Sequence, residues 1–155
     1  MGIEIERKFL VNDLSVLKGR TGITMRQGYL AEGSMSVRVR LAGTQGFITL
    51  KGTAPGLSRP EFEYSIPERD ALDLLNNHVT LGSLDKIRFL VPVGRHTFEV
   101  DMFVGPLAGL VVAEVELSSE AEEFISPPWL GAEVSHDLRY TNAALAKTNR
   151  IPSRD

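Results

Sequence analysis

Apolar and polar residues alternate with a period of two over most of this chain, which is the pattern of strands with two different faces. The alternation predicts eight strands, at residues 3–11, 23–31, 36–42, 46–52, 60–66, 84–91, 96–103 and 110–117. Links of hairpin length containing glycine or proline separate several of them, at 31–34, 43–46, 93–95 and 105–109, so we expect antiparallel neighbours. Helical periodicity is found at 68–77, 119–126 and 141–149, and Thr141 suits an N-cap.

Six of these strands carry two charges of the same sign at a spacing of two residues. The pairs are Glu4 and Glu6, Arg38 and Arg40, Glu61 and Glu63, Lys86 and Arg88, Glu99 and Asp101, and Glu114 and Glu116. This spacing puts both members on one face of a strand, roughly 6.5 Å apart. Solvated sheet faces usually interleave the signs, because adjacent like charges repel. Acidic strands collect cations and basic strands collect anions, so a sheet with both is able to hold a metal-bound polyanion.

The residues between the paired charges are apolar, so each of these strands has one charged and one apolar face. They are Ile5, Val39, Phe62, Ile87, Val100 and Val115. The ordinary arrangement buries the apolar face and leaves the charges in water. The inverted arrangement turns the charges into the interior of a barrel, and it needs helices or a partner subunit to cover the apolar outside. Eight strands can close into a barrel that is wide enough for side chains or one small ligand. The alternation alone leaves both arrangements open.

The composition narrows the class of protein further. A length of 155 residues fits a single domain spanning 1–155 with a real core, and 43% hydrophobic and 24% charged residues are ordinary for a globular protein. The net charge of −3 argues against a general nucleic-acid binder but allows a local cationic cleft. The chain has no cysteine, which excludes disulfides and thiolate chemistry. Charges throughout the first twenty residues leave no apolar run for a signal peptide or membrane span, so we expect a soluble, cytoplasmic protein.

The N-terminal run Glu4-Ile-Glu6-Arg-Lys8 resembles the Glu-x-Glu-x-Lys signature of the CYTH, or triphosphate tunnel metalloenzyme, family. The resemblance extends in order over residues 2–149. It continues through Gln27-Gly28-Tyr29-Leu30, Arg38-x-Arg40, Thr49-x-Lys51, Glu61-x-Glu63, Lys86-x-Arg88, Glu99-x-Asp101, Glu114-x-Glu116 and Asp137-Leu-Arg139-Tyr140-x-Asn142. It implies the inverted arrangement: an all-β-dominated (α+β) fold whose eight antiparallel strands form a charged tunnel, with a few peripheral helices.

The same resemblance implies an enzyme that hydrolyses inorganic triphosphate to pyrophosphate and phosphate, since the short bacterial members look most like inorganic triphosphatases. The cofactor would be Mg²⁺ or Mn²⁺, with two ions. Thiamine triphosphatase and class IV adenylate cyclase are alternatives within the family. A non-catalytic module that binds polyphosphate or nucleotides is the alternative from another class. The cyclase would need a purine site, and no aromatic cluster in the sequence indicates one.

Candidate site residues follow from the charged strands and the resemblance together. The predicted metal ligands are Glu4, Glu6, Asp101, Glu114 and Glu116, because carboxylates bind hard divalent cations that bridge to phosphate. The predicted substrate-binding residues are Lys8, Arg38, Arg40, Lys51, Lys86, Arg88 and Arg139. We expect Glu61, Glu63 and Glu99 to balance and orient these cations.

The resemblance also pairs Tyr29 with Lys51 as a catalytic unit that activates water. A tyrosine that lines the barrel wall, or that donates a hydrogen bond to phosphate, is the alternative. Outside the tunnel, an inverted barrel leaves apolar strand faces that three short helices do not cover. We therefore expect a homodimer.

Overall fold

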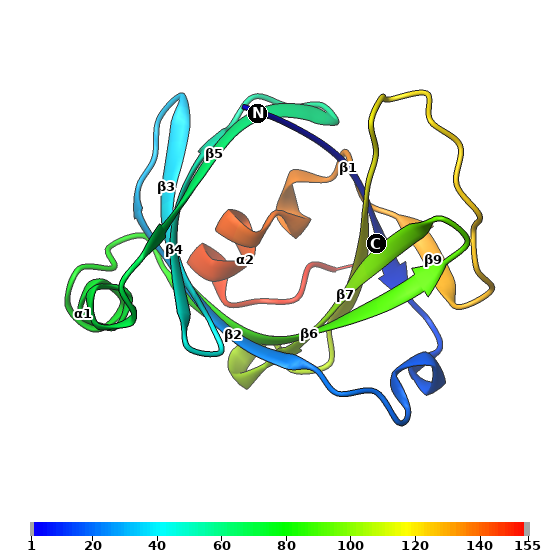
Figure 1. Ribbon diagram of the computed structural model, residues 1–155, viewed down its shortest axis with the longest axis horizontal. Coiled ribbons are helices and arrows are strands. Elements are labelled where there is room, and N and C mark those ends of the chain that lie inside the picture. The colour runs from blue at the N-terminus through cyan, green and yellow to red at the C-terminus, as the bar shows by residue number, and fades with distance from the viewer. Residues whose placement is uncertain (1, 154–155) are drawn as a thin grey trace.

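The structure, a computed structural model, describes residues 2–153 and contains a closed antiparallel barrel of eight strands (Figure 1). Its strands are β1 (Ile3–Val11), β2 (Ile23–Ala31), β3 (Met35–Ala42), β4 (Gln45–Gly52), β5 (Ser58–Ile66), β6 (Ser83–Val93), β7 (His96–Val104) and β8 (Val111–Glu116). They follow the order β5-β4-β3-β2-β6-β7-β8-β1, and a further pairing of β1 with β5 closes the ring. A ninth strand, β9 (Leu130–Glu133), pairs with the second half of β1 and was not predicted.

The predicted helices at 68–77 and 141–149 are confirmed as α1 (Glu68–Asn77) and α2 (Asn142–Thr148). Thr141 caps α2 as expected, since its hydroxyl accepts a hydrogen bond from the Ala144 amide at 3.1 Å. The remaining helical turns are the short 3₁₀ segments η1 (Leu14–Leu17), η2 (Gly105–Leu107) and η3 (Leu138–Tyr140).

The predicted helix at 119–126 is wrong, because this segment is irregular. Eight residues form only a marginal helix without tertiary support, and Pro127-Pro128 prevents the helix from continuing. The segment instead crosses the outside of the barrel, where the ring of Phe124 lies 5.9 Å from that of Phe9 and 6.0 Å from that of Phe98. We call residues 118–129 the strap.

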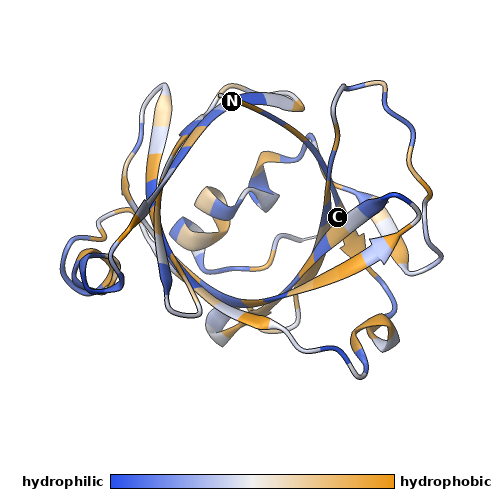
Figure 2. Ribbon diagram, in the orientation of Figure 1, coloured by the Kyte–Doolittle hydropathy of each residue, from blue (hydrophilic) through white to orange (hydrophobic). Residues whose placement is uncertain are grey.

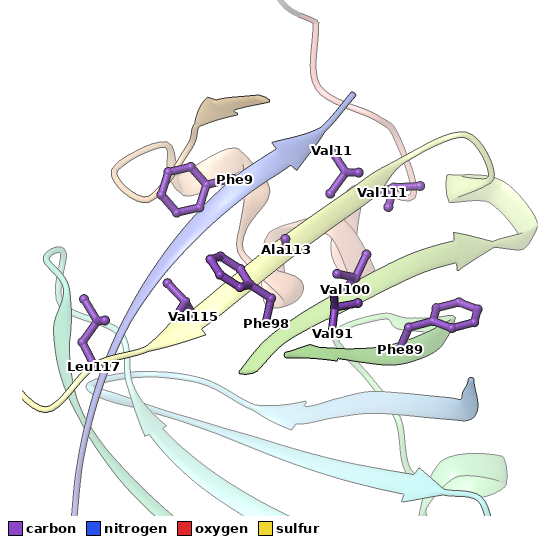
Figure 3. Packing of buried hydrophobic residues seen from close by; sticks show 10 residues of the cluster. All are labelled: Phe9, Val11, Phe89, Val91, Phe98, Val100, Val111, Ala113, Val115 and Leu117. Carbon is purple, nitrogen blue, oxygen red and sulfur yellow. The ribbon is translucent and has the colours of Figure 1, made fainter. Parts of the chain in front are cut away.

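The apolar faces of the strands point out of the barrel, where other segments cover most of them, so the inverted arrangement is confirmed. Along the barrel strands hydrophilic and hydrophobic residues alternate (Figure 2). Figure 3 shows the larger outer cluster, which lies on β1, β6, β7 and β8 and includes the fully buried Phe98, Val100 and Val115. The strap and η1 cover this cluster. On the other side, α1 packs against β3 and β4 over a smaller cluster centred on Val39.

The helix α2 does not lie at the periphery, as the sequence led us to expect. It lies with η3 across one end of the barrel, inside the ring of strands when the barrel is viewed along its axis (Figure 1). Tyr140 and Leu145 are buried there in a cluster that includes Leu84 and Phe103. Gly82 permits this packing, because its φ is +98° and a Cβ at this position would lie 2.3 Å from the Ala146 carbonyl oxygen. We call residues 137–148 the plug.

One outer face stays uncovered by these elements. Ile3 on β1 is 64% exposed, and Phe62 and Tyr64 on β5 are 42% and 58% exposed. No helix within residues 2–153 is long and apolar enough to cross a membrane.

Candidate active site

A cavity of about 330 Å³ lies at the plugged end of the barrel, within the size range of small-ligand pockets. Strands β1 to β5 and the plug all contribute to its wall. Of the predicted site residues, it brings together Glu4, Glu6, Lys8, Tyr29, Arg38 and Lys51. Arg40, Lys86, Arg88, Asp101 and Glu114 lie further along the barrel interior, whereas Glu116, at the end of β8, is exposed.

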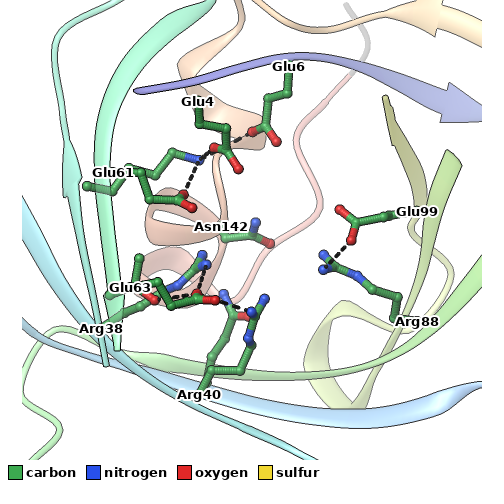
Figure 4. A network of polar contacts seen from close by, with 12 residues as sticks. Glu4, Glu6, Arg38, Arg40, Glu61, Glu63, Arg88, Glu99 and Asn142 are labelled. Carbon is green, nitrogen blue, oxygen red and sulfur yellow. Dashed lines mark hydrogen bonds and ion pairs between the residues drawn. The ribbon is translucent and has the colours of Figure 1, made fainter. Parts of the chain in front are cut away.

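An acidic group surrounds the ammonium group of Lys51. Its Nζ lies 2.6 Å from Glu4 Oε1, 3.3 Å from Glu6 Oε1 and 3.8 Å from Glu61 Oε2 (Figure 4). Burial works against the charge on Lys51, but the carboxylates of Glu6 and Glu4 outweigh it and raise its pKa. Lys51 therefore compensates for the charges of Glu4, Glu6 and Glu61 in the structure.

The acidic wall continues onto β8, where the register puts like charges opposite each other. Glu6 faces Glu116 across β1 and β8, and Glu99 faces Glu114 across β7 and β8. Burial and the carboxylate of Glu114 raise the pKa of Glu6 well above its usual value, and burial and Glu4 raise the pKa of Glu116. Although burial acts in the opposite direction, Lys8, Arg88 and Lys86 lower the pKa of Glu114 well below its usual value, so the shortage of cations concerns Glu6 and Glu116.

The residues present fit a divalent metal ion. Glu114 Oε1 and Glu61 Oε2 are buried and accept no hydrogen bond, and burial together with Glu4 raises the pKa of Glu61 to about 7. Buried carboxylate oxygens without donors are suitable ligands for Mg²⁺ or Mn²⁺. Among residues 2–153 no three acidic or histidine side chains already form a ligand group, and Lys51 occupies the space between Glu4 and Glu6.

Three arginines gather on the basic wall, which β3 and β6 provide. Arg40 lies 3.3 Å from Glu63 and Arg38 lies 3.9 Å from the same carboxylate (Figure 4). Burial and the nearby guanidinium groups of Arg38 and Arg88 lower the pKa of Arg40. The Nε atoms of Arg38 and Arg40 are buried without a hydrogen bond. These buried donors without acceptors suit a polyanion, whose phosphate oxygens guanidinium groups bind in pairs.

Asp101 takes up a different position from the one expected of a metal ligand. It is fully buried, and its two oxygens receive hydrogen bonds from Arg88 Nε at 2.8 Å and Arg88 Nη2 at 2.9 Å. Lys86 Nζ lies 2.8 Å from the same carboxylate and 3.3 Å from Asn142 Oδ1 in α2. Two cations occupy the carboxylate of Asp101, which argues against metal binding there. Asp101 instead forms ion pairs with Lys86 and Arg88, the two residues that the sequence predicts to bind phosphate.

Lys86 is the most deeply buried of the predicted substrate-binding residues, since its side chain is 1% exposed. Burial lowers its pKa to about 8, although Asp101 acts in the opposite direction. Arg88 is also bound to Glu99 at 3.2 Å. Glu61, Glu63 and Glu99 each contact one or more of the predicted cations, as a charge-balancing role requires.

Tyr29 and Lys51 line the same cavity but have separate partners. The phenol oxygen of Tyr29 accepts a hydrogen bond from Gln27 Nε2 at 3.0 Å, and Tyr29 lies directly opposite Arg38 in the register of β2 and β3. Within residues 2–153 no hydrogen bond or ion pair joins Tyr29 to Lys51. Their action as a unit stays a prediction. Lys8 reaches the plug, where its Nζ donates to the Tyr140 carbonyl at 2.9 Å.

Arg139 does not line the cavity. Its guanidinium is half exposed, pairs with Asp137 at 2.7 Å and donates to the Ser153 carbonyl at 2.9 Å, beside a separate hollow formed by residues 133–139. This placement argues against the predicted substrate contact, because two local partners already hold the side chain outside the tunnel.

Sequence reasoning assigned no role to three polar residues that the structure places at the site. Gln27 contacts Tyr29, Asn142 contacts Lys86, and Arg59 lines the cavity from β5. Gln27 and Asn142 stand inside the segments that carry the family resemblance. Arg59 precedes Glu61 by two residues, so extending the alternation of β5 backwards would have found it.

Comparisons with known proteins agree on one family. The CYTH domain matches residues 2–148. An inorganic triphosphatase of Acetivibrio thermocellus is 41% identical over 148 residues, which cover 95% of both chains. An inorganic triphosphatase of Nitrosomonas europaea is 42% identical over 150 residues, covering 92% of this chain and 96% of the relative. A crystal structure of an inorganic triphosphatase aligns with a TM-score of 0.66 and 37% identity, covering 97% of each chain.

Removing the charge of Asp101 tests whether this residue is structural. We expect Asp101→Asn to lower the free energy of unfolding by about 3–5 kcal/mol, because it leaves the buried Lys86 and Arg88 without their carboxylate. Asp85→Asn, on the exposed outer face of the same β6–β7 pair, is the matched control. It should change the free energy of unfolding by less than about 0.5 kcal/mol. Urea denaturation measures both. Equal stability of the two variants would contradict the role given to Asp101.

Proposed function

The chain belongs to the CYTH domain family, and we propose that it hydrolyses inorganic triphosphate to pyrophosphate and phosphate inside the barrel, with the help of divalent metal ions. One observation carries the proposal. A single closed barrel presents an acidic wall and a basic wall to the same interior, and each wall has buried polar atoms without a hydrogen-bond partner: Glu61 Oε2 and Glu114 Oε1 on one side, Arg38 Nε and Arg40 Nε on the other. The two inorganic triphosphatases that are 41% and 42% identical to the chain support the choice of substrate.

The basic wall would bind the substrate. Arg38, Arg40 and Arg88 provide planar guanidinium groups that hold two phosphate oxygens each, and the lysines act as point charges. The inside of a barrel keeps most bulk water away, so these attractions are stronger than at a surface. Asp101 keeps Arg88 and Lys86 in place while the anion binds. Catalysis of phosphoryl transfer depends mainly on such positioning and charge stabilisation.

The acidic wall would hold the metal through Glu4, Glu6, Glu114 and Glu116. We propose two ions, Mg²⁺ or Mn²⁺, because these carboxylates belong to two neighbouring strands and outnumber what one cation needs when water and phosphate complete its coordination. When bound, such ions polarise the phosphoryl group and offset charge on the leaving group. Asp101 is left out of this set because Arg88 and Lys86 occupy its oxygens.

For the proton of the attacking water we propose Tyr29, assisted by Lys51. The phenol oxygen faces the cavity from β2, where Gln27 fixes its orientation. Lys51 enters the same cavity from β4. The carboxylates nearby are assigned to metal or to lysine and arginine partners, so we assign the proton transfer to the phenol group of Tyr29.

A phosphate-release assay tests the proposed function directly. Inorganic triphosphate, pyrophosphate, ATP and thiamine triphosphate are each supplied with magnesium, manganese or calcium. We expect kcat/KM for inorganic triphosphate to exceed that for ATP at least tenfold, about 1.4 kcal/mol in transition-state binding. Faster turnover of ATP, or formation of cyclic AMP, would favour the cyclase. Faster turnover of thiamine triphosphate than of inorganic triphosphate would favour a thiamine triphosphatase. If no compound is hydrolysed, the result would favour a non-catalytic module that binds polyphosphate or nucleotides.

If divalent metal ions bind to the acidic wall, the metal requirement of turnover should depend strongly on the carboxylate of Glu116. Chelation should abolish turnover, and Glu116→Gln should raise the metal concentration needed for half-maximal rate at least tenfold or stop turnover, because it removes a charged oxygen ligand. Glu123→Gln, in the exposed strap, is the control and should behave as the wild type. Metal titrations of the steady-state rate give both values. An unchanged requirement in Glu116→Gln would remove this residue from the site.

The catalytic pair predicts a particular pattern of kinetic losses. Tyr29→Phe should lower kcat by about 10²–10⁴-fold while affecting KM little, since a general base acts on the chemical step. Lys51→Ala should lower kcat and raise KM, because its charge also serves the phosphate. If the residues act as one unit, the double variant should be little slower than the worse single variant. Tyr64→Phe on the outer face is the control. Full activity of Tyr29→Phe would make Tyr29 a wall residue.

We also propose that the chain forms a homodimer through the exposed apolar face of β1 and β5. Ile3 and Phe62 lie on adjacent strands there, and neither α1 nor the strap covers them. Sedimentation velocity should show a dimer at micromolar concentration, and Phe62→Glu should shift it to monomer. A wild-type monomer at every concentration would refute the dimer without bearing on the tunnel.

A further inference from the structure

Arg59 stands at the beginning of β5 and points into the barrel. Side chains alternate along a strand, so Arg59 shares its face with Glu61 and Glu63, whose carboxylates contact the interior cations. The register of β1 and β5 places Arg59 directly opposite Glu4. Arg59 is half-buried and lines the cavity together with Glu4, Lys8 and Lys51. It is thus a component of the charged interior and not of the outer surface.

The other cations of this cavity have partners within the protein, but Arg59 has none in the part of the chain that the structure describes. Lys8 donates to the Tyr140 carbonyl, Lys51 is held by Glu4 and Glu6, and Lys147 pairs with Glu32 at 2.7 Å. Glu4, which faces Arg59, is bound to Lys51 instead. No hydrogen bond or ion pair of the Arg59 side chain to any of residues 2–153 is formed.

A half-buried guanidinium has five donors and no acceptor, so an anion that replaces water around Arg59 gains charge-assisted hydrogen bonds. Carboxylates of the acidic wall are already shared among Lys51 and their neighbours, so the acceptor must come from outside the protein. The cavity is open to a ligand of small size. A phosphate group supplies the planar pair of oxygens that a guanidinium binds best.

The position of Arg59 along β5 determines which phosphate group of the ligand its side chain would contact. Glu63, beside Arg38 and Arg40, lies four residues further along the strand, roughly 13 Å away at the rise of a β-strand. Arg59 therefore extends the basic lining beyond the arginine cluster, toward the plugged end. Resting on the proposed function, we propose that Arg59 is a substrate-binding residue that holds the terminal phosphate of inorganic triphosphate farthest from Arg40.

This placement makes the contribution of Arg59 dependent on the length of the phosphate chain. Inorganic triphosphate reaches from the arginine cluster toward Arg59, whereas pyrophosphate bound at that cluster is one phosphate shorter. Loss of Arg59 should therefore weaken triphosphate more than pyrophosphate. A residue that acted only through its long-range field would weaken both to the same degree.

The test compares Arg59→Gln, Arg59→Lys and the wild type with the control Arg69→Gln, whose guanidinium is 91% exposed on α1 outside the barrel. Steady-state kinetics give kcat and KM for inorganic triphosphate, and calorimetry in the presence of a chelator gives the dissociation constants of triphosphate and pyrophosphate. We expect Arg59→Gln to raise KM and the dissociation constant of triphosphate about tenfold or more, the loss typical of one charge-assisted hydrogen bond. Arg59→Lys should recover part of it, and Arg69→Gln should match the wild type.

Each outcome decides one question. A smaller loss for pyrophosphate than for triphosphate supports contact with the chain end. Equal losses for the two anions, or wild-type constants in Arg59→Gln, overturn the proposal, provided that thermal unfolding shows the variant folded. If the wild type itself neither binds nor hydrolyses triphosphate, the proposed function fails and the proposal for Arg59, which rests on it, fails with it. Wild-type turnover with an unaffected Arg59→Gln variant rejects the proposal for Arg59 alone.

Discussion

The buried ion pair between Arg88 and Asp101 is the interaction on which the interior of this barrel depends. A lone arginine or lysine inside a protein is strongly unfavourable, and a second cation two residues away makes it worse. Asp101 is fully buried, binds Arg88 through both oxygens and also lies 2.8 Å from Lys86. One carboxylate therefore holds two neighbouring cations of the same strand. Without it, Arg88 and Lys86 would be buried without a full counter-charge in the absence of a ligand.

The inversion of the barrel follows from placing charge inside. Because the inner faces carry charges, the apolar faces have to be covered from outside, and the chain uses a different element for each part of the surface. The strap covers β1, β7 and β8 through Phe124 and Trp129, and α1 covers β3 and β4. The plug closes one end, where Tyr140 and Leu145 bury apolar area. Segments without catalytic residues thus stabilise an interior that is itself poor in apolar contacts.

The strands could be predicted, because period-two alternation is a local property of the sequence, whereas the inward direction of their charged faces followed only from the family resemblance. The contacts between side chains on neighbouring strands could not be predicted in this way. Whether Asp101 meets a metal ion or a guanidinium depends on the register that puts it opposite Arg88, and no spacing along the chain encodes that. The strap was mistaken for a helix because tertiary packing of Phe124 outweighs a short helical pattern. Arg139 carries the expected charge, but a partner two residues away, Asp137, holds it outside the tunnel.

The position of Lys51 links the two walls energetically. Its ammonium group lies between Glu4 and Glu6, which are also proposed metal ligands, and the oxygens that hold Lys51 cannot serve a divalent cation fully at the same time. Within the proposed function, carboxylates engaged by metal leave Lys51 available to phosphate, and phosphate bound to Lys51 leaves the carboxylates available to metal. Thermodynamic linkage makes such an effect reciprocal, so each ligand raises the affinity for the other by the same factor. The arrangement that holds Lys51 against Glu4 and Glu6 without ligands thus favours simultaneous binding of both.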